Sequence, residues 1–336
     1  MTISTFTGTD GLKNFLNPEN HSTPLVELPP TLNPYFDDNV HIFIKMQSLL
    51  PLLNVKMLPA WQMLKDAPSG KKHLVEASSG NTALSMAILA QYFGFDDTKS
   101  YLTTSTTIGK IKMLLLFGSN VSLVNEDESN QDDPDTTINR AKNDGKKDSW
   151  YNPNQYANPS NPKSHENIAG PQIFEQLGGE VDVFAGGLGT SGTVLGVSQY
   201  LRRVKKDIKI VGIVRAKGEI VPGPREREFL DVVELDWESA SDVVLAIGQQ
   251  EAYKHSLRLL QAGLMAGPST GLNYAGLLRY LERVVKDKLD DKPLNAVFMA
   301  CDTTLLYIDD YFKILPREDF PTLEGEELMT EEIFAE

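Results

Sequence analysis

The stretch "VDVFAGGLGTSGTVLGVSQYLRR", from Val181 to Arg203, decides the fold of this chain. A short apolar run leads into Gly187, Gly189 and Gly192, and a helix-like pattern follows them. The order G-x-G-x-x-G has the form of a dinucleotide-binding fingerprint. A strand, a glycine turn and a helix N-terminus bind an anion because free N–H groups and the positive end of the helix converge there. The stretch therefore predicts a phosphate-binding loop, with a tight turn that caps its own helix as the alternative.

The surroundings of this loop favour a ligand smaller than a dinucleotide. A dinucleotide site has an acidic residue about 20 positions on, at the end of the next strand. Here the strand "IKIVGIV" runs into the basic segment Arg215–Lys217, although an arginine could serve an NADP phosphate. Within the loop, Thr190, Ser191 and Thr193 add hydroxyl donors, which suit a terminal monophosphate with its two charges. We therefore expect a cofactor monophosphate, with a dinucleotide oxidoreductase as a minor alternative.

Composition excludes several classes of protein. The chain has 336 residues, 41% of them hydrophobic, which is enough for a large α/β core. Its net charge of −14 would repel nucleic acid. The single Cys301 excludes an intramolecular disulfide framework, the five histidines have no metal-ligand spacing, and the N-terminus lacks a signal-peptide pattern. We expect a cytoplasmic protein with no metal, nucleic-acid or membrane partner.

The rest of the chain alternates short apolar runs with longer stretches of helical period, which is typical of βα units in a parallel sheet. One series covers residues 73–125 and a second covers 164–312. Between them lies "YNPNQYANPSNP", which we expect to be neither regular helix nor strand and to cross between two layers or domains. The acidic tail 316–336 is expected to be a loosely attached surface segment, with a partner-binding helix as the alternative.

Two upstream stretches add candidate chemistry. "EASSGNTALSMAILA" places small hydrogen-bond donors between a strand and an apolar helix, a second site for an anion such as a carboxylate. These donors are Ser78, Ser79, Gly80, Asn81 and Thr82. In "KMQSLLPLLNVKMLPAWQML", Lys56 is a lone charge among apolar residues. Its amine either reaches water or is desolvated, and desolvation would lower its pKa toward that of a usable nucleophile.

Together these stretches resemble the fold-type II pyridoxal-phosphate (PLP) enzymes, in particular the cysteine synthase and cystathionine β-synthase group. The resemblance runs from about Thr23 to Phe312 and includes "EASSGNTA", the long segment "YANPSNPKSHENIAGPQIFEQLGGEVDVFAGGLGTSGTVLGV", "GPSTG" and "VFMACDTTLLY". It implies an α/β fold of the tryptophan synthase β type, with two αβα domains and PLP in the cleft between them. The smaller domain would span 46–150, with a mobile part at about 86–124, and the larger would span 1–45 plus 151–315. The resemblance also implies a homodimer.

The resemblance further implies a role for each motif. Lys56 would bind PLP covalently and remove the Cα proton of the substrate. Asn81 would hydrogen-bond the cofactor's 3-hydroxyl, and Thr303 would face its pyridine nitrogen, although a one-residue slip would place Asp302 there. The cofactor phosphate would be held by Gly189, Thr190, Ser191, Gly192 and Thr193. The substrate would be bound by Ser78, Ser79, Gly80, Asn81, Thr82 and Gln155.

The implied reaction is a β-replacement on an activated L-serine, such as O-acetylserine or O-phosphoserine, in which β-elimination is followed by addition of a nucleophile. Two alternatives stay open: a PLP-dependent serine or threonine dehydratase, and a catalytically inactive paralogue with a binding role. The second is motivated by "PLLNVKMLP", which lacks the Gly-Ser and Asp-Arg pairs that flank the lysine in the family. The segment "VPGPREREF" also departs from the family. Its Arg225 and Arg227 could clamp an acidic substrate, or form a solvated loop neutralised by Glu226 and Glu228.

Overall fold

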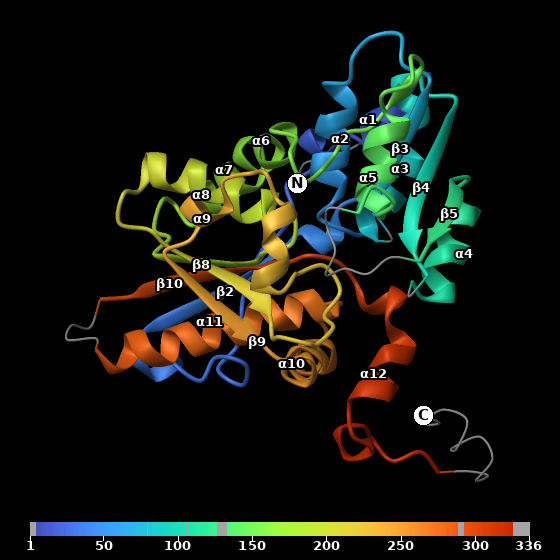
Figure 1. Ribbon diagram of the computed structural model, residues 1–336. Coiled ribbons are helices and arrows are strands. Elements are labelled where there is room, and N and C mark those ends of the chain that lie inside the picture. Colours follow the sequence, from blue (N-terminus) through green and yellow to red (C-terminus); the bar gives the residue numbers. More distant parts are fainter. Residues whose placement is uncertain (1–4, 79, 105, 126–132, 288–291, 325–336) are drawn as a thin grey trace.

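The computed structural model describes residues 5–78, 80–104, 106–125, 133–287 and 292–324, and within them the strands form two sheets (Figure 1). The larger sheet has the order β1-β2-β10-β7-β8-β9. Only its edge strand β1 runs antiparallel to its neighbour, within the described residues. The bounds in that order are Leu25–Glu27, Val40–Met46, Leu294–Ala300, Val183–Gly187, Lys209–Arg215 and Val243–Ile247.

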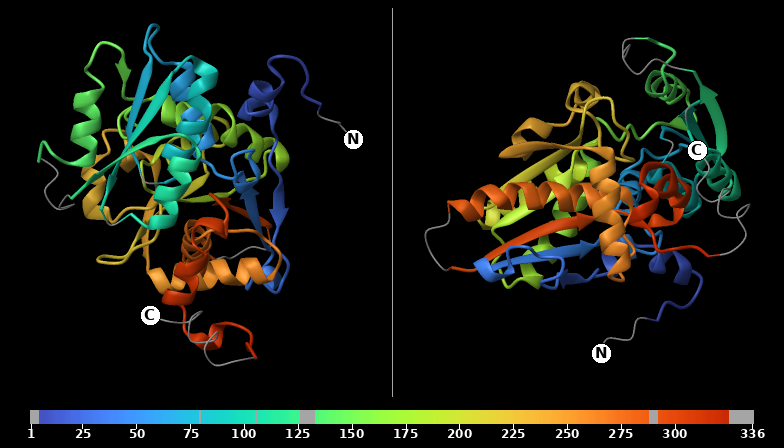
Figure 2. Two further views of the ribbon diagram at one scale, coloured as in Figure 1. Left: turned by 90° about the vertical axis from the view of Figure 1, so that its right-hand side faces the viewer. Right: turned by 90° about the horizontal axis from the view of Figure 1, so that it is seen from below.

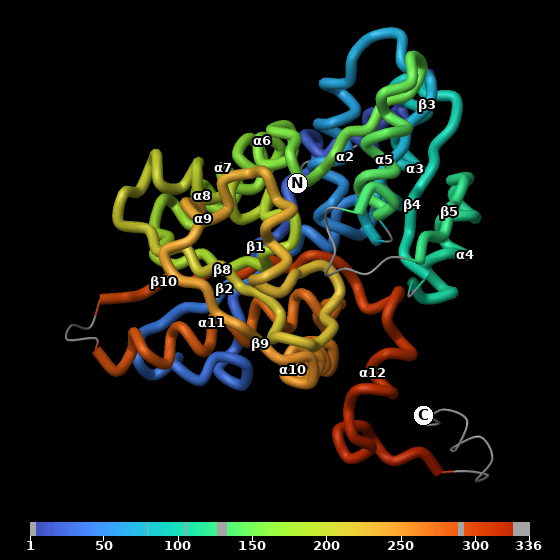
Figure 3. The backbone as a smooth tube through the Cα atoms, viewed as in Figure 1, coloured from blue at the N-terminus to red at the C-terminus, as the bar shows by residue number. Residues whose placement is uncertain are grey.

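The smaller sheet is parallel and has the order β5-β4-β3-β6. Its strands span Asn120–Val124, Asp97–Thr103, His73–Ala77 and Trp150–Tyr151. Figure 3 follows the chain from the N-terminal strands of the larger sheet, through the smaller sheet, and back to the larger sheet. The larger sheet is therefore built from two segments that are separated in sequence by the smaller one.

Helices cover both faces of each sheet. In the larger sheet α6 (Ser160–Asn167), α7 (Ala169–Gln176) and α8 (Gly192–Val204) lie on one side, and α10 (Gln249–Gln261) and α11 (Pro268–Lys286) lie on the other. In the smaller sheet α5 (Thr137–Asp144) lies on one face, and α3 (Asn81–Leu89) and α4 (Ile108–Leu116) on the other. Helix α2 (Met57–Lys65) packs between α6 and the smaller unit's α3. Figure 2 shows α11 running along the larger sheet. Both units thus have the expected αβα layers.

The alternation of side chains along strand β7 shows why this sheet needs two helical layers. Phe184 belongs to the hydrophobic cluster on the α8 side, while Val183 and Ala185 belong to the cluster on the α11 side. All three side chains are almost completely buried. Parallel strands that are buried on both faces read as continuous apolar runs, as "VDVFAG" does.

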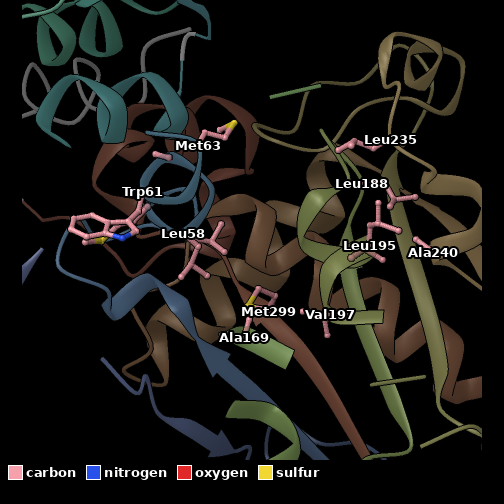
Figure 4. Close-up of a cluster of buried hydrophobic side chains, with 14 of the residues drawn as sticks. Leu58, Trp61, Met63, Ala169, Leu188, Leu195, Val197, Leu235, Ala240 and Met299 are labelled. Carbon is pink, nitrogen blue, oxygen red and sulfur yellow. The ribbon is translucent and has the colours of Figure 1, made fainter. Parts of the chain in front are cut away.

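Helix α2 joins the two units. Its Leu58, Trp61 and Met63 belong to the same hydrophobic cluster as Met299 of strand β10 and Ala169 of helix α7 (Figure 4). That cluster also contains Leu74, Met86 and Leu89 of the smaller unit. The two sheets therefore share one continuous core, and the residue that begins α2, Lys56, is held between them.

The remaining helices are short. They are α1 (Gly11–Phe15), α9 (Trp237–Ala240) and α12 (Ile308–Ile314), and α12 packs on α10 through Tyr311 and Tyr253, whose ring centroids are 5.0 Å apart. The described part of the acidic tail folds back, because Phe320 stacks on Phe312 at 4.6 Å. The rest of the tail, 325–336, lies outside the described residues, as does most of the acidic run 126–135. No helix in the described part of the chain is long and apolar enough to span a membrane.

The expectation that "YNPNQYANPSNP" contains no regular structure is wrong at both ends. Tyr151 belongs to strand β6, and helix α6 already begins at Ser160. The prolines do not prevent this helix, because Pro159 is its N-cap and Pro162 lies in its first turn, where a missing N–H breaks no helical hydrogen bond. The intervening residues do cross between the two sheets, and Gln155 and Tyr156 reach the pocket described next.

Candidate active site

A pocket of about 540 Å³ lies where the carboxyl ends of both sets of parallel strands meet. Its walls include Gly187 and Arg215, the last residues of β7 and β8, together with Asp302 after β10 and Ser78 after β3. Open α/β sheets bind their ligands at this edge, and the volume suits a small-molecule site.

Lys56 lines this pocket at the N-cap of helix α2. The loop before it is fixed against the end of strand β10, because Val55 N–H donates to the Cys301 carbonyl at 2.7 Å and Asn54 pairs with Asp302 in an isolated β-bridge. Burial lowers the pKa of the Lys56 amine, against the opposing effect of Cys301 and Asp302. A lysine with a lowered pKa supplies the neutral amine that a nucleophile or base requires.

The glycine loop is built as a cradle for an anion. Gly187, Gly189, Thr190 and Thr193 line the pocket at the start of helix α8. Glycine is needed at 189, because a Cβ there would lie 2.4 Å from the Gly223 carbonyl oxygen. Ser191 caps the helix in a left-handed conformation (φ 64°). Its hydroxyl is buried and has no hydrogen-bond partner within the described residues.

Helix α6 supports this cradle from behind. Asn161 Nδ2 donates to Thr190 Oγ1 at 3.0 Å and to the Gln155 carbonyl at 2.8 Å. One turn further on, His165 Nε2 lies 3.2 Å from Thr193 Oγ1. Burial, with a smaller effect of the Lys56 charge, lowers the pKa of His165 to about 3, so its ring is neutral. The two threonine hydroxyls are thereby oriented by neutral partners.

The loop before helix α3 and the crossing segment both contribute residues to the pocket. Ser78, Gly80, Asn81, Thr82 and Gln155 all line it, whereas Ser79 lies outside the described residues. Thr82 Oγ1 donates to Gln155 Oε1 at 2.8 Å, and Gln155 Nε2 donates to the Ala77 carbonyl at 3.3 Å. These bonds hold the N-terminus of α3 and the Gln155 side chain together before any ligand arrives.

Asp302 is one of the residues that line the pocket, whereas Thr303 is not. Oδ2 of Asp302 accepts hydrogen bonds of 2.7 Å from Asn81 Nδ2 and from the Tyr307 hydroxyl. Burial raises the pKa of this carboxyl above its ordinary value, although both hydrogen bonds oppose the rise. Thr303 is buried outside the lining. The sequence did not decide which of these two neighbours lines the pocket, because that depends on the bridge between Asp302 and Asn54.

The structure separates the two arginines that were considered as a clamp. Arg225 lines the pocket, whereas Arg227 is exposed and lies outside the described lining. Sequence reasoning gave no role to several pocket residues, Lys110 and Tyr156 among them. Tyr156 sits in the quoted crossing segment, so its position beside Gln155 was the available signal, while Lys110 is brought in by the fold alone.

A lysine of lowered pKa, a glycine turn at the start of helix α8 and the start of helix α3 share one pocket between the two sheets. The family model described as "Pyridoxal-phosphate dependent enzyme" matches residues 16–302. The chain belongs to this family of PLP-dependent enzymes, and it is an enzyme of the cysteine synthase type. The Thr190 and Thr193 hydroxyls and the start of helix α8 supply donors that fit the cofactor's phosphate, and Lys56 and Asn81 line the same pocket.

Curated relatives cover most of the chain. It is 31% identical to cysteine synthase B of Pseudomonas aeruginosa over 292 residues, which is 84% of this chain and 91% of that protein. It is 29% identical to the N-(2-amino-2-carboxyethyl)-L-glutamate synthase of Ralstonia nicotianae over 308 residues, or 86% and 87% of the two chains. Among solved structures, O-ureido-L-serine synthase matches with a TM-score of 0.76 at 21% identity, covering 94% of this chain and 98% of that one. This last likeness shows the shared fold.

Proposed function

We propose that the protein catalyses PLP-dependent β-replacement on an activated L-serine such as O-acetylserine or O-phosphoserine. The observation that carries the proposal is the position of the Lys56 amine, desolvated in one pocket with the phosphate cradle and the Ser78–Thr82 loop. A serine derivative with a good leaving group at Cβ needs a base at Cα, a site for its carboxylate and a bound electron sink. In this proposal Lys56 would be the base, the start of helix α3 would bind the carboxylate, and PLP would be the electron sink.

Each side chain has a defined task in this proposal. The start of helix α3 with Thr82 and Gln155 would bind the substrate carboxylate, because N–H groups and hydroxyls there are already held in place. Lys56 Nζ would take the proton from Cα and hold it for the later protonation, as its lowered pKa allows. PLP, when bound, withdraws the electron pair that the departing proton leaves at Cα. Gly189 to Thr193 would hold its phosphate, as expected from the sequence.

Two neighbouring residues compete for the position that meets the cofactor's pyridine nitrogen. Thr303 stays a prediction for it, but Asp302 is the side chain that reaches the pocket. We therefore propose that Asp302 takes this position. A carboxyl group there favours a protonated ring, which strengthens electron withdrawal relative to a neutral hydroxyl.

The names of the relatives support a serine-derived donor. Cysteine, O-ureido-L-serine and N-(2-amino-2-carboxyethyl)-L-glutamate all contain a 2-amino-2-carboxyethyl unit, attached through sulfur, oxygen and nitrogen respectively. The nucleophile thus varies among these proteins while the serine-derived part is shared. We propose that this protein likewise combines a serine-derived donor with a nucleophile of its own. We also propose that it is a cytoplasmic homodimer, whose mass light scattering would measure.

The test is to mix the PLP-loaded protein with O-acetylserine or O-phosphoserine, with and without sulfide or an amino-acid nucleophile. A change in cofactor absorption on adding the donor alone, followed by a new β-substituted amino acid when the nucleophile is added, is the expected result. Release of ammonia and keto acid at the same rate with or without nucleophile would establish a dehydratase instead. No spectral change with either donor would refute the proposed function.

A further inference from the structure

We propose that Lys110 and Arg225 form a subsite for a second anionic group of a substrate, separate from the α-carboxylate site at the start of helix α3. The proposal rests on the proposed function, since it names the class of substrate that this pocket accepts. The second anion is either the phosphate of the serine donor or a carboxylate of the nucleophile.

The charge of the pocket lining is opposite to that of the protein. The chain has 46 acidic and 32 basic residues, for a net charge of −14. Among the described residues of the pocket lining, the four basic ones are Lys56, Lys110, Arg215 and Arg225, and the two acidic ones are Asp302 and Asp310. A cationic cleft in an acidic protein concentrates anionic substrates at the site.

Arg225 is fixed in a geometry that suits a carboxylate or phosphate. Its guanidinium stacks on the ring of Tyr156 at 5.1 Å, and Nη2 donates to the Tyr156 hydroxyl at 3.0 Å. Its backbone is held as well, because its N–H donates to the Leu188 carbonyl and its carbonyl accepts from Arg215 N–H. A stacked guanidinium with a defined plane binds a planar or tetrahedral anion through two parallel hydrogen bonds.

Lys110 brings a second cation from the smaller unit. It lies in the first turn of helix α4, lines the pocket, and places Nζ 5.3 Å from the centre of the Tyr307 ring. No ion pair joins it to a carboxylate in the described part of the chain, although Asp310 and Asp302 are near enough to affect it. An ammonium that is partly desolvated beside a ring gains from an anion that enters the pocket.

The other basic residues have tasks already. Arg215 Nη2 lies 3.6 Å from Oε1 of the buried Glu226, so its charge is balanced within the protein. Lys56 serves the cofactor and the Cα proton. The cofactor phosphate has its own donors in the backbone and hydroxyls of the Gly189–Thr193 loop. Lys110 and Arg225, which both line the pocket, are the pair that we assign to a group of the substrate.

The first experiment measures binding to the PLP-loaded protein by calorimetry, using two pairs that differ mainly in one charged group. O-phospho-L-serine against O-acetyl-L-serine tests the donor, and L-glutamate against L-glutamine tests the nucleophile. We expect the anionic member of at least one pair to bind about 10- to 100-fold more tightly, and the pair that responds identifies the source of the anion. Equal affinity within both pairs would overturn the proposal.

The second experiment uses matched variants. Arg225→Gln and Lys110→Met should each lower the preference for the anionic member about tenfold, whereas Arg227→Gln and Lys112→Met, exposed residues two positions away, should keep it. If Arg225→Gln instead weakens PLP binding and leaves the preference intact, the guanidinium serves the cofactor and the proposal fails. L-Glutamate and L-glutamine carry no leaving group at Cβ, so their relative affinity is independent of whether any serine donor reacts, which the proposed function requires.

Discussion

Asn81, the first residue of helix α3, donates a 2.7 Å hydrogen bond from Nδ2 to Oδ2 of Asp302, which follows strand β10 of the other sheet. The same carboxylate oxygen accepts from the Tyr307 hydroxyl at 2.7 Å. The site therefore joins the two units through a buried carboxyl group. The carboxyl group lines the pocket, and its hydrogen bond to Asn81 depends on how closely the smaller unit lies to the larger one.

Asp302→Asn should weaken PLP binding about tenfold and change the pH dependence of the bound cofactor's absorption. The variant removes the titrating carboxyl, whose pKa burial has raised, but keeps an oxygen for Asn81 and Tyr307. Thr303→Val is the matched comparison, because Thr303 is a buried neighbour outside the pocket lining. The measurements are a PLP titration by fluorescence and absorption spectra from acid to alkaline pH. If Thr303→Val has the larger effect, the Thr303 hydroxyl, and not Asp302, faces the pyridine nitrogen.

Lys56→Ala should abolish covalent attachment of PLP and lower the rate of the serine reaction about a thousandfold or more, because both nucleophile and general base are lost. Lys65→Ala, at the exposed end of the same helix α2, controls for any general effect of removing a lysine. Mass spectrometry after borohydride reduction locates the attached cofactor. Attachment that persists in Lys56→Ala would assign the role to another lysine.

Asn161→Ala should weaken PLP binding roughly 5- to 30-fold. The side chain makes two buried hydrogen bonds, to Thr190 of the phosphate cradle and to the Gln155 carbonyl of the crossing segment, and their loss costs about 1–2 kcal/mol. Asn167→Ala changes an exposed residue of the same helix and should leave the affinity unaltered. Equilibrium dialysis with PLP compares the two, and equal affinities would mean that α6 does not position the cradle.

The sequence predicted the elements whose apolar period is uninterrupted. Strands β3 and β7 and helices α8 and α10 lie within the two predicted series, 73–125 and 164–312, because each buries a regular face that its own residues define. Strand β9 was not foreseen, because "VVLAI" is a short run with no distinguishing feature beside the helix that follows. Strand β2, "VHIFIKM", was also not named, and its Lys45 is a charged residue where a central strand has none.

The candidate site likewise has residues that the sequence predicted and residues that it did not. Lys56, Asn81, Thr82, Gln155 and Gly189 were named from the sequence and line one pocket, because short motifs at helix starts carry their geometry with them. Their individual roles stay predictions. The choice between Asp302 and Thr303, and between Arg225 and Arg227, depends on which of two neighbours turns inward. That is decided by contacts with segments far along the chain, such as Asn54 and Tyr156.

Lys45 provides a test of stability that is independent of the site. Its side chain is fully buried in strand β2, and Nζ donates to the Thr23 carbonyl at 2.6 Å and to Oε1 of both Gln172 and Gln176 at 2.8 Å. These acceptors are neutral, and burial lowers the pKa of the amine from 10.5 to about 7. Between those two values the unfolded chain binds a proton that the folded chain does not, so the free energy of unfolding rises with pH in this window.

Lys45→Met should remove this dependence. Between pH 7 and pH 10 we expect the free energy of unfolding to rise by up to about 4 kcal/mol more in the wild-type protein than in Lys45→Met, because the cost of burying the charged amine disappears as it loses its proton. Urea unfolding at a series of pH values measures the difference, and Lys65→Met, which removes an exposed lysine, should behave like the wild type. Parallel pH profiles for the wild type and Lys45→Met would show that the three oxygen acceptors keep the buried amine charged throughout.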